Sequence, residues 1–111
     1  MLSPERRQKN HEGLGTRLKD ARVAAGYTQK ALADALGIEY YTMISQMELG
    51  YISIPPALWS PIADKLKLDR PSWVLACLRS IQPEVFTAIF GNKSVAEVKA
   101  TLMKLDKGIQ D

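Results

Sequence analysis

One segment constrains the fold more than any other part of the chain: residues 28–50, with the sequence TQKALADALGIEYYTMISQMELG. It contains two stretches of helical spacing separated by Gly37, and Gly50 follows the second. Thr28 is a good N-cap for the first helix, which is expected to end at Leu36. The second helix is expected over residues 39–49. Because so short a connection forces a large angle between two helices, the segment predicts a helix-turn-helix.

The remaining sequence also has helical spacing, and no stretch alternates apolar and polar residues as a strand would. A helix is expected from Leu14, with Gly26 just beyond its end. Four more helices are expected to start near Pro56, Asp69, Pro83 and Ser94. Pro61 is expected to kink the first of these four or delay its start, and Gly108 to end the last.

These elements predict an all-α protein with three parts. Residues 1–12 have no apolar period and are interpreted as a flexible arm. Residues 13–70 are expected to form the helix-turn-helix domain, as part of a compact bundle of about five helices. Residues 71–111 are expected to form a helical extension. A chain of 111 residues is long enough to bury one such core.

Composition excludes several classes of function. The single cysteine, Cys77, rules out an intrachain disulfide and a zinc cluster, and the single histidine, His11, lies in the arm. Without converging titratable groups we expect neither an enzyme nor a bound metal or other cofactor. No apolar run approaches the ~18 residues that span a bilayer, so a cytoplasmic protein without membrane contact is expected. The net charge of +3 permits binding to nucleic acid but does not by itself indicate it.

Residues 13–70 resemble the lambda repressor and Cro family of helix-turn-helix regulators. Residues 14–22, LGTRLKDAR, are similar to the first helix of that family. The helix-turn-helix positions that carry the resemblance are Thr28, Gln29, Leu32, Ala33, Gly37, Ile44, Ser45, Glu48 and Gly50. The spacing from Gly37 to Glu48 is one residue longer than is common in the family. We place the extra residue near Ile38 and Glu39.

The resemblance implies binding to double-stranded DNA, with the helix over residues 39–49 in the major groove. With Ile44 and Met47 facing inward, the outer face of this helix is expected to hold Tyr40, Tyr41, Thr42, Ser45 and Gln46. These are short polar or aromatic side chains, and the glutamine can pair with adenine through two hydrogen bonds. The tyrosines can contact phosphates or thymine methyl groups, although one of them can equally pack against the turn.

The predicted groove-binding helix has no lysine or arginine, so contacts to phosphate must come from other elements. Gln29 stands at the start of the first helix of the pair, where a helix N-terminus favours an anion. Arg17, Lys19 and Lys30 are the candidate cations. The resemblance further implies a structural role for Arg22 and Glu48, as a buried ion pair between the first helix and the end of the groove-binding helix.

The extension is still apolar, which predicts an interface. Val95, Val98, Leu102 and Leu105 have the a/d spacing of two heptads, too short to be stable unpacked. The residues predicted to form a homodimer interface are Trp73, Phe86, Phe90, Val95, Val98, Leu102 and Leu105. A dimer would bind a dyad-symmetric operator, as a repressor. Two alternatives stay open: the tail folds back on its own domain, or the chain is an antitoxin or adaptor that binds a protein partner.

Overall fold

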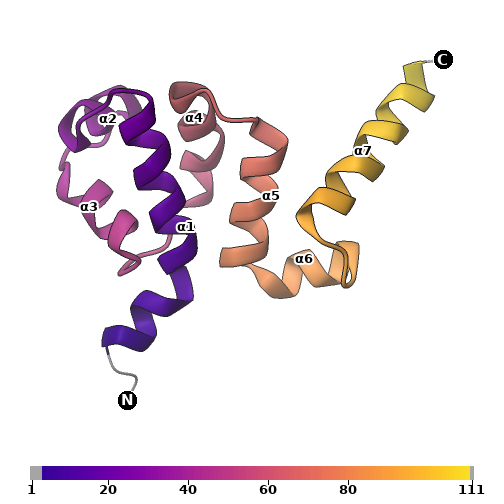
Figure 1. The fold of residues 1–111 in the computed structure, drawn as a ribbon, viewed down its shortest axis with the longest axis horizontal. Helices are drawn as coiled ribbons and strands as arrows, with labels where there is room; N and C mark the ends of the chain where they lie inside the picture. The colour runs from indigo at the N-terminus through magenta and orange to yellow at the C-terminus, as the bar shows by residue number, and fades with distance from the viewer. Residues whose placement is uncertain (1–3, 111) are drawn as a thin grey trace.

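A computed structural model describes the backbone of residues 4–110 and the side chains of residues 13–105. Within these residues the chain is all helical, as predicted, and no strand is present (Figure 1). The helices are α1 (Pro4–Ala24), α2 (Gln29–Leu36), α3 (Thr42–Leu49), α4 (Pro56–Leu66), α5 (Arg70–Ile81), α6 (Pro83–Phe90) and α7 (Val95–Gln110). The helix-turn-helix pair, α2 and α3, lies at one end of the molecule and α7 at the other.

The first helix begins at Pro4, ten residues before the apolar spacing that predicted it. Proline is favoured in the first turn of a helix, and the charged residues that follow are good helix formers. A helix that is polar all round has no apolar period, so its sequence resembles an arm. The backbone of residues 4–12 is helical, which corrects the interpretation of this segment as a flexible arm. The side chains of these residues are not among those described.

The second helix of the pair begins at Thr42, three residues later than predicted. Gly37 adopts a left-handed conformation, with φ of 73°, that ends α2. Ile38 then donates its backbone N–H to the carbonyl of Ala33, and its side chain packs against the core. Because these contacts turn the chain inward, helical hydrogen bonding resumes only beyond Tyr40. Residues 37–41 therefore form the turn between α2 and α3.

Five helices share the main hydrophobic core. Its buried members are Leu14, Leu18, Leu32, Ala33, Ile44, Met47, Ile54, Trp59, Ile62, Ala63, Leu66, Trp73, Ala76 and Cys77. Burial raises the pKa of the Cys77 thiol to about 12, so this cysteine is an apolar core residue. The indole N–H of Trp59 donates to the carbonyl of Ile54 at 2.8 Å and fixes the loop before α4.

Pro61 lies inside α4 without ending it. Its ring nitrogen cannot donate to the carbonyl of Ala57, four residues earlier. Both residues are exposed, so that carbonyl can bond to water instead. The helix therefore continues to Leu66, and the predicted delay of its start does not occur.

Helix α5 has two buried faces. Trp73, Ala76 and Cys77 belong to the main core, whereas Leu75 packs in a second cluster with Phe86 of α6 and Val98 of α7. The main core thus extends beyond residue 70 into α5. The two helices beyond the five-helix bundle, α6 and α7, form the extension and pack on the far side of α5 (Figure 1).

Helix α7 begins as predicted and ends later than predicted. Ser94 and Glu97 form a capping box: the Ser94 hydroxyl accepts the backbone N–H of Glu97, and the Glu97 carboxylate accepts that of Ser94. The helix continues through Gly108 to Gln110, because a glycine inside a helix weakens it without forcing an end. Lys99 forms an ion pair with Asp69, the N-cap of α5, at 2.7 Å.

The predicted dimer residues fall into two groups. Trp73, Phe86 and Val98 are buried within the chain itself, which corrects their assignment to a surface available to a second copy. The first turns of α7 thus pack on α5 and α6 of the same chain. The other group remains accessible: Phe90 and Val95 are half-buried, and Leu102 and Leu105 are exposed.

Within the described residues, no helix is long and apolar enough to cross a membrane. The same part of the chain contains no group of three or more His, Cys, Asp or Glu side chains that could hold a metal ion.

Candidate nucleic-acid interface

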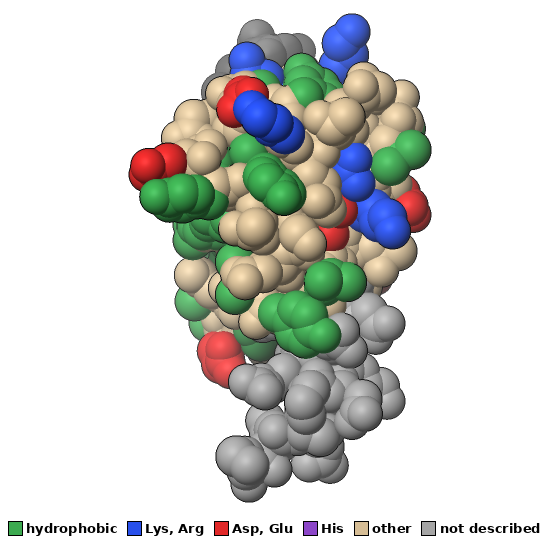
Figure 2. Space-filling model, turned by 90° about the vertical axis from the view of Figure 1, so that its left-hand side faces the viewer, with side chains coloured by type: hydrophobic (Ala, Val, Ile, Leu, Met, Phe, Trp, Pro, Cys, Tyr) green, Lys and Arg blue, Asp and Glu red, His purple; other side chains and the backbone are tan. Residues whose placement is uncertain are grey.

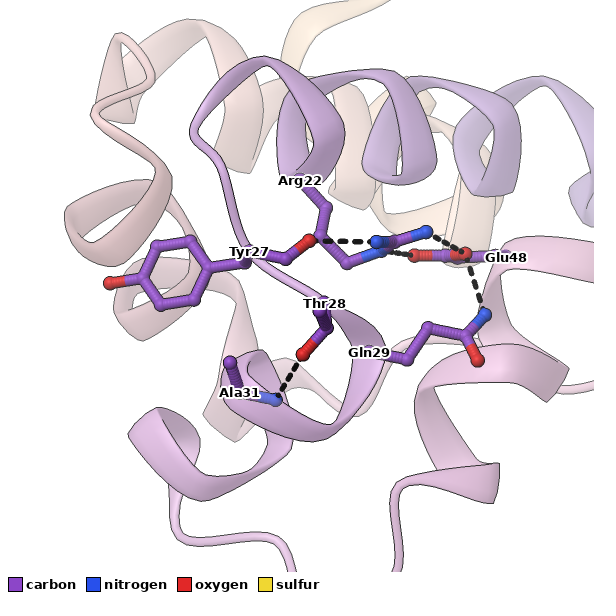
Figure 3. A network of polar contacts seen from close by, with 6 residues as sticks. All are labelled: Arg22, Tyr27, Thr28, Gln29, Ala31 and Glu48. Atoms are coloured by element: carbon purple, nitrogen blue, oxygen red, sulfur yellow. Dashed lines mark hydrogen bonds and ion pairs between the residues drawn. The ribbon is translucent and has the colours of Figure 1, made fainter.

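Local signals set the two helices of the pair. The Thr28 hydroxyl accepts the backbone N–H of Ala31 at 3.0 Å and caps α2 (Figure 3). At the other end of the motif, Gly50 ends α3 with φ of 82°, in the left-handed region that favours glycine. Both helices have only eight residues, so their positions depend on packing more than on intrinsic helix stability.

Packing decides which face of α3 is outward. Ile44 and Met47 are fully buried in the main core, as predicted. On the other side Thr42 and Gln46 are exposed and Ser45 is half-buried. The face expected to meet DNA is therefore accessible along one side of the helix.

The two tyrosines lie at the turn before α3 rather than on it. Tyr40 and Tyr41 remain exposed, at 68% and 51% of their full surface, so neither packs into the turn. Tyr41 occupies the N-cap position of α3 without a side-chain hydrogen bond to the helix. Their phenol groups extend the accessible surface of α3 at its N-terminal end.

Helix α1 approaches α3 very closely at one point. A Cβ atom at Gly15 would lie 2.5 Å from the carbonyl oxygens of both Met47 and Glu48, which is a severe clash. Only glycine therefore permits this crossing, and an isolated glycine in a helical pattern is the sequence signal for it. The crossing fixes the C-terminal end of α3 against the first helix.

A buried polar network lies beside this crossing (Figure 3). The Arg22 guanidinium donates from Nε to Glu48 Oε2 at 2.5 Å and from Nη2 to Oε1 at 3.2 Å. Its third nitrogen donates to the carbonyl of Tyr27 at 2.8 Å. The ion pair implied by the family resemblance is thus present and buried, and it joins α1, the start of α2 and α3.

Gln29 belongs to the same network. Its Nε2 donates to Glu48 Oε1 at 3.1 Å, because only the N–H end of the amide can face a carboxylate. The amide has two N–H groups, so one remains for another acceptor. Glu48 thereby positions the side chain that was predicted to contact phosphate.

A hollow forms where α1, α2 and α3 meet on the outer surface. It is lined by Thr16, Lys19, Asp20, Gln29, Ser45, Glu48 and Leu49. Of the predicted site residues, Gln29, Ser45, the candidate cation Lys19 and the structural residue Glu48 line it. Thr16 and Leu49 were missed, because helical spacing alone does not show which residues of α1 lie beside α3.

The predicted cations separate in the structure. Lys30 is exposed near the start of α2 and forms only a surface ion pair with Asp34, at 3.4 Å. Lys19 lines the hollow. Arg17, by contrast, lies over the ring of Trp73 on α5, at 5.8 Å, and not beside α3. It is two residues from Gly15, about 200° around the helix, and therefore points to the other side of α1.

The face that carries α2 and α3 is largely neutral (Figure 2). Backbone, uncharged polar and apolar side chains cover most of its area, and a few lysines, arginines and acidic residues are scattered among them. Attraction to phosphate on this face therefore depends on few cations.

The geometry defines the class of the protein: a helical domain with a helix-turn-helix whose second helix is held outward by a buried core. The comparison with protein families agrees, since the helix-turn-helix family model matches residues 18–72. Over these residues the chain belongs to the lambda repressor-like helix-turn-helix family of DNA-binding regulators. No curated protein and no solved structure gives a significant match.

Proposed function

We propose that the chain is a sequence-specific regulator of transcription that binds double-stranded DNA with α3 in the major groove. The observation that carries this proposal is the outward face of α3. Thr42 and Gln46 are exposed on it, while Ile44 and Met47 anchor the opposite face. The groove-binding helix is residues 42–49, shorter than the sequence indicated.

Base contacts come from the neutral side chains of this face. Gln46 pairs with adenine through two hydrogen bonds, and Thr42 and Ser45 act as donor or acceptor. Tyr40 and Tyr41 contact thymine methyl groups or phosphates from the turn. Because no arginine or lysine lies on α3, the commonest specific contact to guanine is lacking there.

Phosphate contacts come from α1 and α2. Lys30 and the N-terminus of α2 meet one phosphate, and the free N–H of Gln29 adds a hydrogen bond. Of the other two candidate cations, Lys19 borders the hollow and contacts a second phosphate, whereas Arg17 lies over Trp73 and is no longer proposed to contact DNA.

The proposed regulator is a cytoplasmic homodimer on a dyad-symmetric operator, and the proposed outcome is repression, since a protein bound over a promoter excludes others from it. The remaining candidates for the dimer contact are the exposed Leu102 and Leu105, with Phe90 and Val95 at the edge. Half-sites would lie about one helical turn apart, ~34 Å.

A second candidate function is an antitoxin or adaptor that binds another protein. It is favoured by the apolar side chains that α6 and α7 leave exposed, among them Ile89 at 62% and Leu105 at 58%. A stable complex with another protein and no affinity for DNA would support this alternative over the first.

The main experiment is selection of bound sequences from random duplex DNA, followed by gel-shift titration at several salt concentrations. Gln46→Ala should weaken binding to the selected site by about 1–3 kcal/mol and relax the preference at one base pair. Lys30→Ala should weaken all sequences alike and flatten the salt dependence. No enrichment at low salt, or identical sequence profiles for the two variants, would contradict the proposed role of α3.

A further inference from the structure

A second surface hollow lies on the opposite side of α1 from the DNA-binding face. It is lined by Arg17 of α1, by Ala76, Arg79 and Ser80 of α5, and by Val95 of α7. It therefore touches both the helix-turn-helix unit and the extension. Two arginines line the hollow, Arg17 from α1 and Arg79 from α5, and none of its lining residues is acidic.

Both arginines are held by aromatic rings instead of carboxylates. The Arg17 guanidinium lies 5.8 Å from the centre of the Trp73 ring, and that of Arg79 lies 5.9 Å from the centre of the Phe86 ring. Among the described side chains neither forms an ion pair, in contrast to Arg22 and Arg70. A ring face attracts the positive charge but does not occupy the five N–H donors as a carboxylate would.

The surroundings reinforce the positive charge. Arg79 also borders a neighbouring hollow that contains Lys93. Asp20, the described carboxylate nearest to Arg17 in sequence, lines the hollow beside α3 instead. The Ser80 hydroxyl supplies a further donor, and Ala76 and Val95 supply an apolar wall.

We propose that this hollow binds a small organic anion. Its oxyanion head, carboxylate or phosphate, lies between the guanidinium groups of Arg17 and Arg79, which match both anions geometrically. Its carbon skeleton lies against Ala76 and Val95. Because the lining comes from α1, α5 and α7, the bound anion contacts the helix-turn-helix unit and the extension at once.

The test uses the full chain without DNA, so its outcome is independent of DNA binding. Backbone amide and arginine Nε signals are followed by NMR at constant ionic strength during titration with benzoate, with inorganic phosphate, or with benzamide. Benzamide is an uncharged analogue of benzoate. We expect saturable shifts at Arg17, Ser80 and Val95 with at least one of the two anions and none with benzamide. A response to benzoate alone identifies a carboxylate site, and a response to phosphate alone identifies a phosphate site.

Variants localise the binding. Arg17→Gln and Arg79→Gln should each weaken it about tenfold or more, because each removes charged hydrogen bonds. Arg79→Lys, which keeps the charge but loses the planar fork, should fall between Arg79→Gln and the natural chain. Lys65→Gln, on the exposed surface of α4, removes the same charge elsewhere and should leave binding unchanged.

Three results would overturn the proposal: shifts that rise linearly with both anions, equal responses to benzoate and benzamide, or binding that survives loss of either arginine. Should Arg17→Gln disturb the fold through Trp73, Arg79→Gln decides the question alone, since its ring partner lies outside the main core.

Discussion

At the scale of single residues, the best-defined feature is the polar network around Glu48. The network contains four hydrogen bonds. The Glu48 carboxylate accepts two from Arg22 and one from Gln29, and Arg22 donates the fourth to the carbonyl of Tyr27. A buried ion pair adds little net stability but imposes geometry, because an unpaired buried charge is costly. Here it fixes the orientation of Gln29 relative to α3, and thus the predicted phosphate contact relative to the predicted base contacts.

The first prediction concerns this pair. Arg22→Met or Glu48→Leu alone should destabilise the protein by about 3–5 kcal/mol, since each leaves an uncompensated buried charge. The double variant should recover much of that loss, although Gln29 and the Tyr27 carbonyl each lose a partner. Urea unfolding of the four proteins measures the coupling. Strictly additive losses would mean that the two residues do not share one buried interaction.

The second prediction concerns Asp69, the N-cap of α5. Hydrogen bonding to Lys99, and then to Ser72, lowers the pKa of Asp69 from 3.8 to about 2. A lowered acid pKa stabilises the fold above pH 4 or so, and this contribution is lost as the pH falls towards 2. Lys99→Gln should raise the pKa of Asp69 in an NMR titration of its carboxyl carbon, whereas Lys65→Gln should not. An unchanged pKa in Lys99→Gln would show that the ion pair does not hold α7 on α5.

At the scale of elements, the placement of α3 rests on its crossing with α1. The absent side chain of Gly15 lets the backbone of α1 touch the last turn of α3, next to the buried ion pair. The short helix α3 is thereby held in place by the longer helix α1. The outward face of α3 follows from this crossing together with the burial of Ile44 and Met47.

The third prediction compares two glycines of α1. Gly15→Ala should destabilise the fold strongly and weaken DNA binding, because its Cβ would meet backbone oxygens that cannot move independently. Gly13→Ala is the matched control: nothing lies within 4 Å of its Cβ, and alanine favours a helix by about 0.5–1 kcal/mol over glycine. Thermal unfolding should therefore shift in opposite directions, and equal shifts would exclude the close crossing.

At the scale of the whole molecule, two hydrophobic clusters share α5. The main core is shared by the five helices from α1 through α5. The smaller cluster connects α5 with α6 and α7 through Leu75, Phe86 and Val98. The extension is therefore attached to the helix-turn-helix unit by a common helix and not by a linker. From Ala100 to Leu105 the surface of α7 is exposed, and in Figure 1 this end of the helix leads away from α5.

The fourth prediction follows from this arrangement. A chain ending at Gln82 keeps the main core and should unfold cooperatively, whereas a chain ending at Asp69 loses Trp73 and Cys77 from it and should not fold. Removing one large buried side chain costs about 3–5 kcal/mol, a large part of a total stability of roughly 5–15 kcal/mol. Circular dichroism and urea titration distinguish the two. Independent folding of the shorter chain would place α5 outside the core.

The same truncation tests the proposed dimer. Light scattering should find a dimer for the full chain and a monomer for the chain ending at Gln82, because the exposed residues of α7 are then absent. A truncated chain that stays dimeric would place the interface in the helix-turn-helix unit.

The sequence alone determined that the motif has two helices and where most of the helix caps lie, although it did not determine that α3 begins at Thr42. The Thr28 cap, the left-handed Gly37 and Gly50, and the Ser94–Glu97 capping box all depend on contacts within a few residues, which spacing and residue type encode directly. The inward positions of Ile44 and Met47 follow from helical periodicity in the same way. The ion pair between Arg22 and Glu48 came from the family resemblance, because no local pattern joins residues this far apart.

Only the tertiary structure decided how the faces of the helices are shared. Arg17 and Lys19 are both cations of α1, yet one stacks on Trp73 and the other lines the hollow beside α3. Likewise, three apolar residues that were predicted to form an interface are buried in the two internal clusters: Trp73 in the main core, and Phe86 and Val98 in the smaller one. Periodicity indicates that one face of a helix is buried. Which element buries that face depends on the packing of segments that are distant in sequence, and this packing exists only in the folded chain.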